Sequence, residues 1–535
     1  MRLVMTVTSS IAAAPGPATV AASRPLFAVA AVIVSSFLAN FDTRLFSVAL
    51  PDLRGAYSLS YDEGAWLSTA STASQIIMAP AVAWMVTVLG LRRVLGIPSL
   101  LYALISFLIP YAQTYPALLA LNIVHSLLLA TFVPATLLII LRSLPVKWWV
   151  PAIAVYSFRV GFTLNSGVAI VGFYVDSVGW QWLYWQDVLI APLMGLFVYL
   201  GIPSAPVNRT VLVGADWGGM LLLGVGMAMI FAGLDQGNRL DWLGSGTVMS
   251  LLGCGALLVT GFFINEAVVG KPWAAADVVL SRNIGVAFVV VTLYVLTSLS
   301  GSLLTPNFLL SVAQLRAAQL GSLFLLYGVL PMILIMPISI FLVRRVDPRW
   351  VLLAGLFAFA MAGLLGTRLT DEWSTGDFIP SMLLQSLGQS LTLFPAMIVA
   401  LSNSDPARST AFAAYIQVIR LGSIEVGTSV MSTWLRTREQ MFSNDLGRHV
   451  AVGDAGVQAF LAKVASDFSS YGAGLAPARA VGILSSLIQR QANTLAYIDG
   501  FWLTVWFAIA ALLIAALLKA APPGPLSPRN SNPSR

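Results

Sequence analysis

The stretch LFAVAAVIVSSFLANFDTRLFSVAL, residues 26–50, sets the class of fold to which this chain belongs. It is long enough for a helix to cross the hydrocarbon of a bilayer, which takes about 20 mostly apolar residues. Two of its residues, Asp42 and Arg44, are nevertheless charged. Because a charge is costly at that depth, each charged residue inside such a segment is a candidate functional residue.

The composition of the whole chain points to a membrane protein. Of the 535 residues, 58% are hydrophobic and 10% are charged, whereas charged residues make up about 25% of an average soluble protein. So few charges cannot cover a water-exposed surface, which excludes soluble, secreted, disordered and nucleic-acid-binding classes. The single cysteine, Cys254, excludes a disulfide framework, and two histidines, His125 and His449, leave little for a histidine metal cluster. We expect neither a metal ion nor a cofactor.

Fourteen segments of the chain are long and apolar enough to span a bilayer. They are residues 26–50, 64–89, 94–112, 115–141, 148–175, 180–202, 217–234, 245–267, 283–310, 317–343, 350–369, 378–401, 409–435 and 495–518. The predicted fold class is therefore an all-α integral membrane protein with fourteen transmembrane helices.

Both termini are predicted to be cytoplasmic. An even number of spans places them on the same side of the membrane, and the distribution of charge selects the side. Lys and Arg are concentrated in the tails and in the loops that contain Arg92, Arg142 and Arg344, whereas Asp and Glu predominate in the opposite loops. By the positive-inside rule, the loops rich in Lys and Arg face the cytoplasm.

An internal repeat predicts how the spans are organised. Pro80 is followed twelve residues later by Arg92, and Pro337 is followed twelve residues later by Arg349. Two repeated halves with a binding site between them are a recurrent transporter plan. The expected organisation is a cytoplasmic tail at 1–25, an N-terminal six-helix bundle at 26–203, two inserted spans at 204–281, a C-terminal six-helix bundle at 282–520 and a second cytoplasmic tail at 521–535.

The loop at 437–491 is exceptionally long and is predicted to lie on the outer, periplasmic side. It contains two amphipathic-looking stretches, residues 457–468 and 478–491, which favour a hydrophilic hairpin of helices. A flexible solvated loop is the alternative.

Several short motifs along the chain occur together in a characteristic order and spacing. They are FDTR at 41–44 with VALP at 48–51, GAW at 64–66, GLDQG at 233–237 with LDWL at 240–243, Trp434 with Arg438, Glu439 and Leu446, and DGFW at 499–502. Together these motifs resemble the major facilitator superfamily, and within it the fourteen-span drug:proton antiporters of the EmrB/QacA type. The resemblance extends over residues 26–518.

The resemblance implies a secondary exporter in the bacterial inner (plasma) membrane. It implies proton-coupled antiport of small amphipathic or aromatic organic compounds by alternating access. It also implies an EmrA-like periplasmic adaptor and an outer-membrane channel as partners, with the loop at 437–491 as the candidate docking surface. The chain carries no Walker-type loop, which disfavours coupling to ATP.

The chain departs from the family pattern in ways that make it a divergent member. Asn122 stands where span 4 usually has an arginine, and Val168 and Val171 stand where the antiporter motif of span 5 has Pro and Gly. These departures leave open an importer or facilitator of an organic anion on the same scaffold. An enzyme or a membrane sensor is disfavoured, because the spans show no His-rich or multi-carboxylate face and the chain has no soluble signalling domain.

Four side chains inside the spans are candidates for carrying the coupling proton: Asp42, Asp187, His125 and Glu425. Carboxylates and imidazoles at bilayer depth are recurrent members of proton relays. A structural ion pair or a hydrogen-bonded packing role is the alternative for each. Asp187 is expected near the wet outer end of its span, which favours a structural role there.

A second group of residues is predicted to line a substrate cavity. Arg159 lies near mid-depth of span 5, and we expect it to replace the missing cation of span 4, close to Asn122 and His125. There it would bind an anionic group of the substrate; a buried pair with Asp42 or Asp187 is the alternative. The other candidates for the cavity are Arg420 and Gln417, which share a helix face, and the aromatic residues Trp66, Tyr156 and Tyr415.

The repeated loops are candidates for a conformational switch. By the resemblance, residues in the loop between spans 2 and 3 and in the loop between spans 10 and 11 would change contacts as the protein alternates. They are Gly90, Arg92 and Arg93 in the first loop and Arg345, Asp347 and Arg349 in the second.

Overall fold

The computed structural model describes residues 24–270, 273–274, 281–403, 409–450, 453–468 and 475–519. Within these ranges the chain is helical and has no β-strand. The predicted tail at 1–25, except for its last two residues, and the predicted tail at 521–535 lie outside the described residues.

The N-terminal bundle consists of seven α-helices. They are α1 (Pro25–Ala56), α2 (Tyr61–Leu89), α3 (Leu91–Leu108), α4 (Tyr115–Leu129), α5 (Phe132–Ser143), α6 (Trp149–Phe173) and α7 (Trp182–Gly201). The predicted span at 115–141 is thus two helices, separated at Ala130 and Thr131. Pro134 explains the break, since it has no N–H to donate to the carbonyl of Ala130.

The two inserted spans and the C-terminal bundle follow in the same style. They comprise α8 (Arg209–Val213), α9 (Trp217–Gly237), α10 (Gly246–Val268), α12 (Arg282–Leu299), α13 (Thr305–Ser311), α14 (Ala317–Leu323), α15 (Leu330–Arg345), α16 (Pro348–Gly366), α17 (Ile379–Ser402), α18 (Ser409–Arg448), α19 (Ala455–Asp467) and α20 (Leu475–Ala515). The domain boundaries at 203, 281 and 437–491 remain predictions.

Two of the predicted spans have a π-helical turn in their interior, and a third turn of this kind, Tyr174–Val178, follows α6 at the end of the span at 148–175. Ser300–Leu304 joins α12 to α13, and Phe324–Val329 joins α14 to α15. A proline follows each of the two interior turns and has no N–H to donate. Pro306 therefore leaves the carbonyl of Ser302 without its helical donor, and Pro331 does the same to the carbonyl of Tyr327. Such turns inside a helix are frequent at functional sites.

The membrane-spanning character of the chain is confirmed. Among the described residues, thirteen helices are long and apolar enough to cross a membrane. The remaining predicted span, 409–435, lies in α18, which is more polar because it carries Arg420 and Glu425. This helix packs against α2, α9, α12 and α20, as a member of the bundle does. The count of fourteen spans is therefore approximate, whereas the all-α membrane fold is secure.

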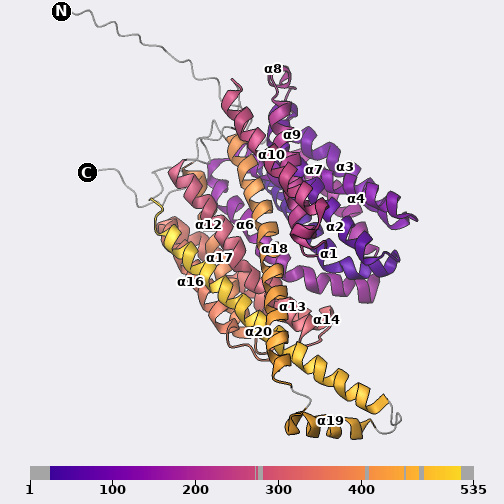
Figure 1. Cartoon of the computed structure of the whole chain (residues 1–535). Helices are drawn as coiled ribbons and strands as arrows, with labels where there is room; N and C mark the ends of the chain where they lie inside the picture. The colour runs from indigo at the N-terminus through magenta and orange to yellow at the C-terminus, as the bar shows by residue number, and fades with distance from the viewer. Residues whose placement is uncertain are drawn as a thin grey trace, which may run out of the picture.

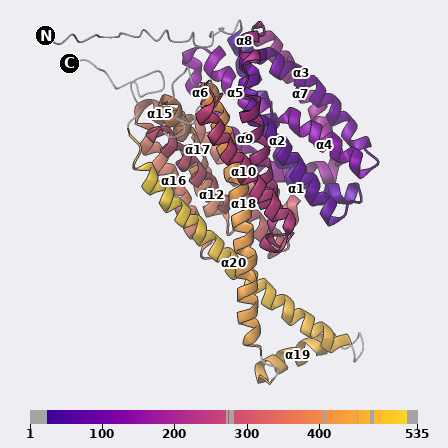
Figure 2. The same cartoon turned by 45° about the horizontal axis from the view of Figure 1, so that its top comes forward.

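A helical hairpin projects from one end of the bundle. α18 and α20 continue past the other helices, and α19 lies across their far ends (Figures 1 and 2). We call this the outer end, and the opposite end, where α18 begins and α20 finishes, the inner end. The predicted helices at 457–468 and 478–491 are present in α19 and in the first part of α20. A flexible loop is the wrong description of these residues.

The two bundles are packed together at the inner end. One continuous cluster of buried apolar side chains includes Ile139 and Ile153 of the N-terminal bundle and Phe394 and Phe412 of the C-terminal bundle. Phe412 lies in the first turn of α18, so this cluster reaches the inner end. Close packing of apolar side chains there leaves no continuous polar route to that end among the described residues.

Candidate functional site

A cavity of about 740 Å³ lies between the two bundles. Helices α1, α2, α4, α5, α6 and α7 line it on one side and α12, α13, α17 and α18 on the other, with α9 of the inserted pair between them. Its lining extends to Asp52, close to the end of α1, and to Asn307 in α13. The cavity therefore opens toward the outer end, whereas the apolar cluster closes the inner end.

Six of the nine charged residues that fall within the predicted spans line this cavity, whereas Glu266, Arg368 and Asp499 do not. The six are Asp42, Arg44, Arg159, Asp187, Arg420 and Glu425. Charged side chains in a membrane are stable only where they face protein or a polar cavity. The folding of the bundle thus gathers charges from α1, α6, α7 and α18 around one space.

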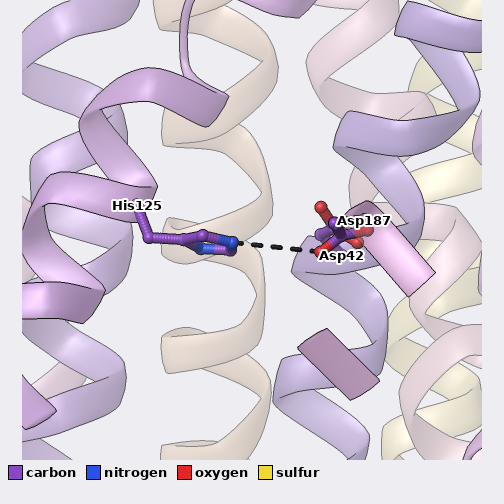
Figure 3. A group of neighbouring side chains, drawn as sticks. All are labelled: Asp42, His125 and Asp187. Atoms are coloured by element: carbon purple, nitrogen blue, oxygen red, sulfur yellow. Dashed lines mark ion pairs between the residues drawn. The ribbon is translucent and has the colours of Figure 1, made fainter. Parts of the chain in front are cut away.

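Asp42, His125 and Asp187 form one compact cluster at the wall of the cavity (Figure 3). They come from α1, α4 and α7, and one ligand atom from each lies within 4.8 Å of those from the other two. His125 Nε2 is 3.9 Å from Asp187 Oδ2. Asp187 is completely buried, so the expectation that it lies near a wet outer end is wrong. The packing of α7 against α1 and α3 removes it from water.

Neighbouring polar groups hold Asp42 and His125 in place. The hydroxyl of Tyr102 and the amide of Gln186 both donate to the carboxylate of Asp42, the latter at 3.4 Å. The ring of Tyr102 also stacks on His125, with 4.1 Å between ring centroids. Ser106 Oγ lies 3.0 Å from His125 Nε2. Asp187 differs, because no N–H or hydroxyl group of the described residues donates to its oxygens, and its polar contact is with the carboxyl group of Asp42.

Arg159 is fully buried at the cavity wall without a carboxylate partner. Its Nη1 donates to the carbonyl of Ser36 at 3.3 Å, and its guanidinium carbon lies 4.0 Å from the ring centroid of Tyr156. Its Nε and Nη2 make no hydrogen bond with the described residues. The described ion pairs do not include one with Asp42 or Asp187, so the alternative of a buried pair is wrong for this conformation.

Arg420 and Gln417 lie beside Arg159 and connect the two bundles. Arg420 Nε donates to Gln417 Oε1 at 3.2 Å, and its Nη1 donates to Asn40 of α1 at 3.4 Å. Gln417 Nε2 donates in turn to the hydroxyl of Tyr156 of α6 at 3.1 Å. This part of the cavity therefore carries two guanidinium groups held by neutral polar side chains.

Two predicted members of the cavity lie elsewhere. Among the described residues, Trp66 and Tyr415 are not part of the lining, whereas Asn122 and Tyr156 are. The indole of Trp66 lies 5.6 Å from the guanidinium of Arg239, and the hydroxyl of Tyr415 donates to the carbonyl of Ala274 at 2.6 Å. The rotation of each helix about its axis turns these rings away from the cavity.

Asp235 is a cavity residue that the sequence reasoning missed. It lies in the last turns of α9, where it accepts hydrogen bonds from Thr69 of α2 and from Gln236. It shares the cavity with Glu425 of α18. Asp235 is part of the GLDQG motif at 233–237, but the predicted span ends at 234, so the sequence places this residue in the following loop. The inserted helices thus take part in the cavity.

The comparisons with known proteins agree with this architecture. The family model of the Major Facilitator Superfamily matches residues 32–263. The multidrug export protein EmrB of Haemophilus influenzae is 23% identical over 500 residues, which cover 90% of this chain and 94% of that protein. EmrB of Escherichia coli is 22% identical over 505 residues, 92% of this chain and 94% of that one. The fatty acid resistance protein FarB of Neisseria gonorrhoeae is 22% identical, over 85% of this chain and 88% of that one.

Solved structures share the fold at lower sequence identity. The proton:xylose symporter XylE superposes with a TM-score of 0.55 at 13% identity, over 93% of this chain and 96% of its own. The human organic anion transporter MFSD10 superposes with a TM-score of 0.56 at 14% identity, over 90% and 99%. The chain is thus similar to EmrB-type proteins of the major facilitator superfamily over most of its length.

The matched superfamily and the relatives consist of transporters, in agreement with the prediction of an integral membrane transporter that is not an enzyme. This similarity also gives a context for the two repeated loops at the inner end. In the first loop, Arg93 Nη1 donates to the carbonyl of Ala205 at 3.1 Å, and the guanidinium of Arg92 lies 3.6 Å from the ring centroid of Tyr199. Gly90 adopts a φ of 83°, and a Cβ there would lie 3.1 Å from Ala205 Cβ.

The arginines of the second loop make contacts similar to those of the first. Arg349 Nη2 pairs with Asp347 Oδ2 at 2.8 Å, and Nη1 donates to the carbonyl of Leu518 at 2.8 Å. The guanidinium of Arg345 lies 5.2 Å from the ring centroid of Phe341. Each loop is therefore tied to the end of the last helix of its own bundle, α7 or α20. The role of these residues as a conformational switch remains a proposal.

Proposed function

We propose that the protein is a proton-coupled antiporter that exports small amphipathic or aromatic organic compounds by alternating access. The observation that carries the proposal is the cavity between the two bundles, which is lined by six of the nine charged residues within the predicted spans. A site between two repeated bundles can be exposed to each side of the membrane in turn as the bundles rock. The open outer end and the closed inner end correspond to an outward-facing state.

The preferred substrates carry an anionic group together with an apolar body. Arg159 and Arg420 supply cationic donors to the cavity, and the donors Nε and Nη2 of Arg159 have no protein acceptor among the described residues. Guanidinium groups in that situation recognise carboxylates and related anions. The names of two relatives, multidrug export protein EmrB and fatty acid resistance protein FarB, support organic substrates of this kind.

Glu425 is the residue to which we assign the coupling proton. Of the four candidates from the sequence, it stands apart from the cluster of Asp42, His125 and Asp187. It lies on α18, which also carries the substrate candidate Arg420, and it faces the cavity. A carboxylate placed there can exchange a proton with the cavity while the substrate group occupies the neighbouring guanidinium.

The proposal places the protein in the bacterial inner membrane with both termini in the cytoplasm. That orientation puts the hairpin of α18, α19 and α20 in the periplasm. The hairpin is the surface on which an EmrA-like adaptor would dock and connect the transporter to an outer-membrane channel. The relatives named EmrB support this assignment, because together they cover most of the chain.

Transport by the purified protein tests the proposal. Proteoliposomes with an imposed pH gradient are supplied with a panel of fluorescent aromatic anions, cations and neutral compounds, and accumulation is followed with time. Proton-driven movement opposite to the proton flux supports the antiporter. Accumulation in the direction of the proton flux, or transport that ignores the gradient, would instead indicate the importer or facilitator of an organic anion.

A further inference from the structure

The cluster of Asp42, His125 and Asp187 has a property that the proposed function does not use. Three groups able to ligate a metal ion converge from α1, α4 and α7, and all three are buried, with exposed fractions of 7%, 6% and 0%. We propose that Asp42, His125 and Asp187 form a binding site for a divalent first-row transition-metal cation of the Zn²⁺ type. This inference does not depend on the direction or coupling of transport.

Among the described residues, the cluster carries two acidic groups without a cationic side chain beside them. Two buried carboxylates, with exposed fractions of 7% for Asp42 and 0% for Asp187, each have an oxygen within 4.8 Å of the other. No Arg or Lys lies within 4.0 Å of either carboxylate in the part of the chain that the structure describes. Buried charges are stable when they are paired or coordinate a metal. A divalent cation between the two carboxylates neutralises the charge of both. The neutral imidazole of His125 then serves as the third ligand.

Asp187 has carboxylate oxygens that are free to coordinate a cation. Its two oxygens are buried and accept no hydrogen bond from an N–H or hydroxyl group of the described residues, although most buried polar atoms have a donor partner. The polar group in direct contact with them is the carboxyl group of Asp42. The carboxylate of Asp187 faces His125, whose Nε2 is 3.9 Å from Asp187 Oδ2 (Figure 3). Ligand atoms around a tetrahedral Zn²⁺ lie about 3.3 Å apart, given bonds of about 2.0–2.2 Å. Small rotations of the two side chains therefore bring them to coordination distance.

Neighbouring side chains hold two of the three proposed ligands in position. Tyr102 and Gln186 each donate to a different oxygen of Asp42, and Tyr102 also stacks on His125. Partners of this kind orient metal ligands in established sites. The mixture of one imidazole and two carboxylates suits Zn²⁺, Mn²⁺ or Co²⁺ better than Ca²⁺ or a thiophilic ion. The cavity provides the entry path and leaves an open coordination position on its side.

The site differs from the expectation drawn from the sequence. The two histidines of the chain leave little for a histidine metal cluster, since only His125 lies in a predicted span. That count did not consider carboxylates from separate spans, which the tertiary structure brings to the same histidine.

Metal binding by the intact, tag-free protein in detergent tests the proposal. The protein is stripped with EDTA and titrated with Co²⁺, whose visible d–d absorption reports coordination by protein ligands, and Zn²⁺ is then added as a competitor. We expect about one Co²⁺ per chain, displaced by Zn²⁺. Asp187→Asn and His125→Gln should each weaken binding by at least about tenfold, and Tyr102→Phe by about 10-fold to 100-fold.

Matched variants separate this site from adventitious binding. Cys254 is an exposed thiol, and His449 is the only other histidine of the chain. Cys254→Ser and His449→Gln should leave the titration unchanged, as should Asp52→Asn at the outer end of the cavity. Binding that disappears in either of the first two variants would assign the metal to the surface and overturn the proposal.

The unaltered protein also decides the question by itself. If it binds no stoichiometric Co²⁺ or Zn²⁺, the two carboxylates are neutralised by protons and the metal site does not exist, even if a variant fails to fold. Transport assayed in the same preparation keeps the two proposals distinct. A protein that transports without metal refutes only the functional need for the cation, and a protein that binds metal without transport refutes only the exporter.

Discussion

Gln417 Nε2 donates a hydrogen bond of 3.1 Å to the hydroxyl of Tyr156, and this bond joins α18 to α6 across the cavity. Both residues are buried, with exposed fractions of 0% and 4%. Because the bond links one bundle to the other, a rocking motion of the bundles has to break or redirect it. Tyr156 also lies against Arg159, and Gln417 accepts from Arg420. The two neutral side chains would thus connect the proposed substrate binding at the arginines with the proposed movement of the bundles.

Removal of this bond should destabilise the outward-facing arrangement. Tyr156→Phe leaves the amide of Gln417 with one fewer acceptor, at a cost of about 1–3 kcal/mol for an unsatisfied buried group. The double variant Tyr156→Phe with Gln417→Leu removes both groups and should lose less than the sum of the single changes. Thermal midpoints in detergent measure the effect, with Tyr61→Phe, an exposed tyrosine, as the control. Strictly additive losses would contradict the coupling.

Replacement of Arg159 should abolish transport without removing the protein from the membrane. Arg159→Gln keeps a polar side chain, although a shorter one, and eliminates the charge offered to an anionic substrate. Arg159→Lys keeps the charge but not the planar donor pair, and should retain only part of the activity. Transport of an anionic dye by proteoliposomes measures the effect. The matched control is Arg209→Gln in the short helix α8, and unchanged export by Arg159→Gln would refute the assignment.

Neutralisation of Glu425 should uncouple transport from protons. In the parent, an imposed gradient with excess protons on the outer side should accelerate export. In Glu425→Gln, export should lose this acceleration and follow the substrate gradient alone, because the side chain no longer exchanges a proton. Initial rates at several imposed gradients provide the measurement. Glu372→Gln, in an exposed loop, should behave like the parent. If Glu425→Gln keeps a normal dependence on the proton gradient, another residue carries the coupling proton.

Shortening the outer hairpin should separate transport from resistance. Replacing residues 449–474, which include α19, by a short Gly/Ser linker should leave the bundle intact, because α19 packs only on the hairpin among the described elements. We expect transport in proteoliposomes to persist and drug resistance of cells to fall. Retained resistance in cells would show that the hairpin is not the docking surface for an adaptor.

Gly90 should be intolerant of a side chain. Its φ of 83° is strained for any residue with a Cβ, and that Cβ would lie 3.1 Å from Ala205 Cβ. Gly90→Ala should therefore cost about 1–2 kcal/mol and lower the thermal midpoint. Gly96→Ala is the matched control, since a Cβ there has no atom within 4 Å and alanine is favoured within a helix. An equal response of the two variants would refute this explanation.

Much of the fold could be predicted from local sequence. In a bilayer each span must satisfy its backbone hydrogen bonds internally, so length and hydropathy identify helices one at a time. The breaks at Ala130, Ser300 and Phe324 were less visible, because a proline within an apolar run does not by itself say whether the helix kinks, bulges or divides. The hairpin helices were recognised because their amphipathic pattern lies outside the membrane.

The candidate site was predicted only in part. Arg159, Arg420 and Gln417 were identified as cavity residues because a polar residue inside a span has to face the protein interior. Trp66 and Tyr415 were placed there incorrectly. The spans are apolar almost all round, so the sequence gives little indication of the direction in which an aromatic ring points.

The sequence by itself determined where the helices lie along the chain and which residues carry charge into the membrane, because both follow from the local cost of placing polar groups in hydrocarbon. Only the tertiary structure decided that Asp42, His125 and Asp187 meet, that Asp187 is fully buried, and that Asp235 of an inserted helix faces the same cavity. The physical reason is that lipid and protein interior are similarly apolar. Helix–helix contacts in a membrane therefore depend on side-chain packing and polar contacts between spans, which no single span encodes.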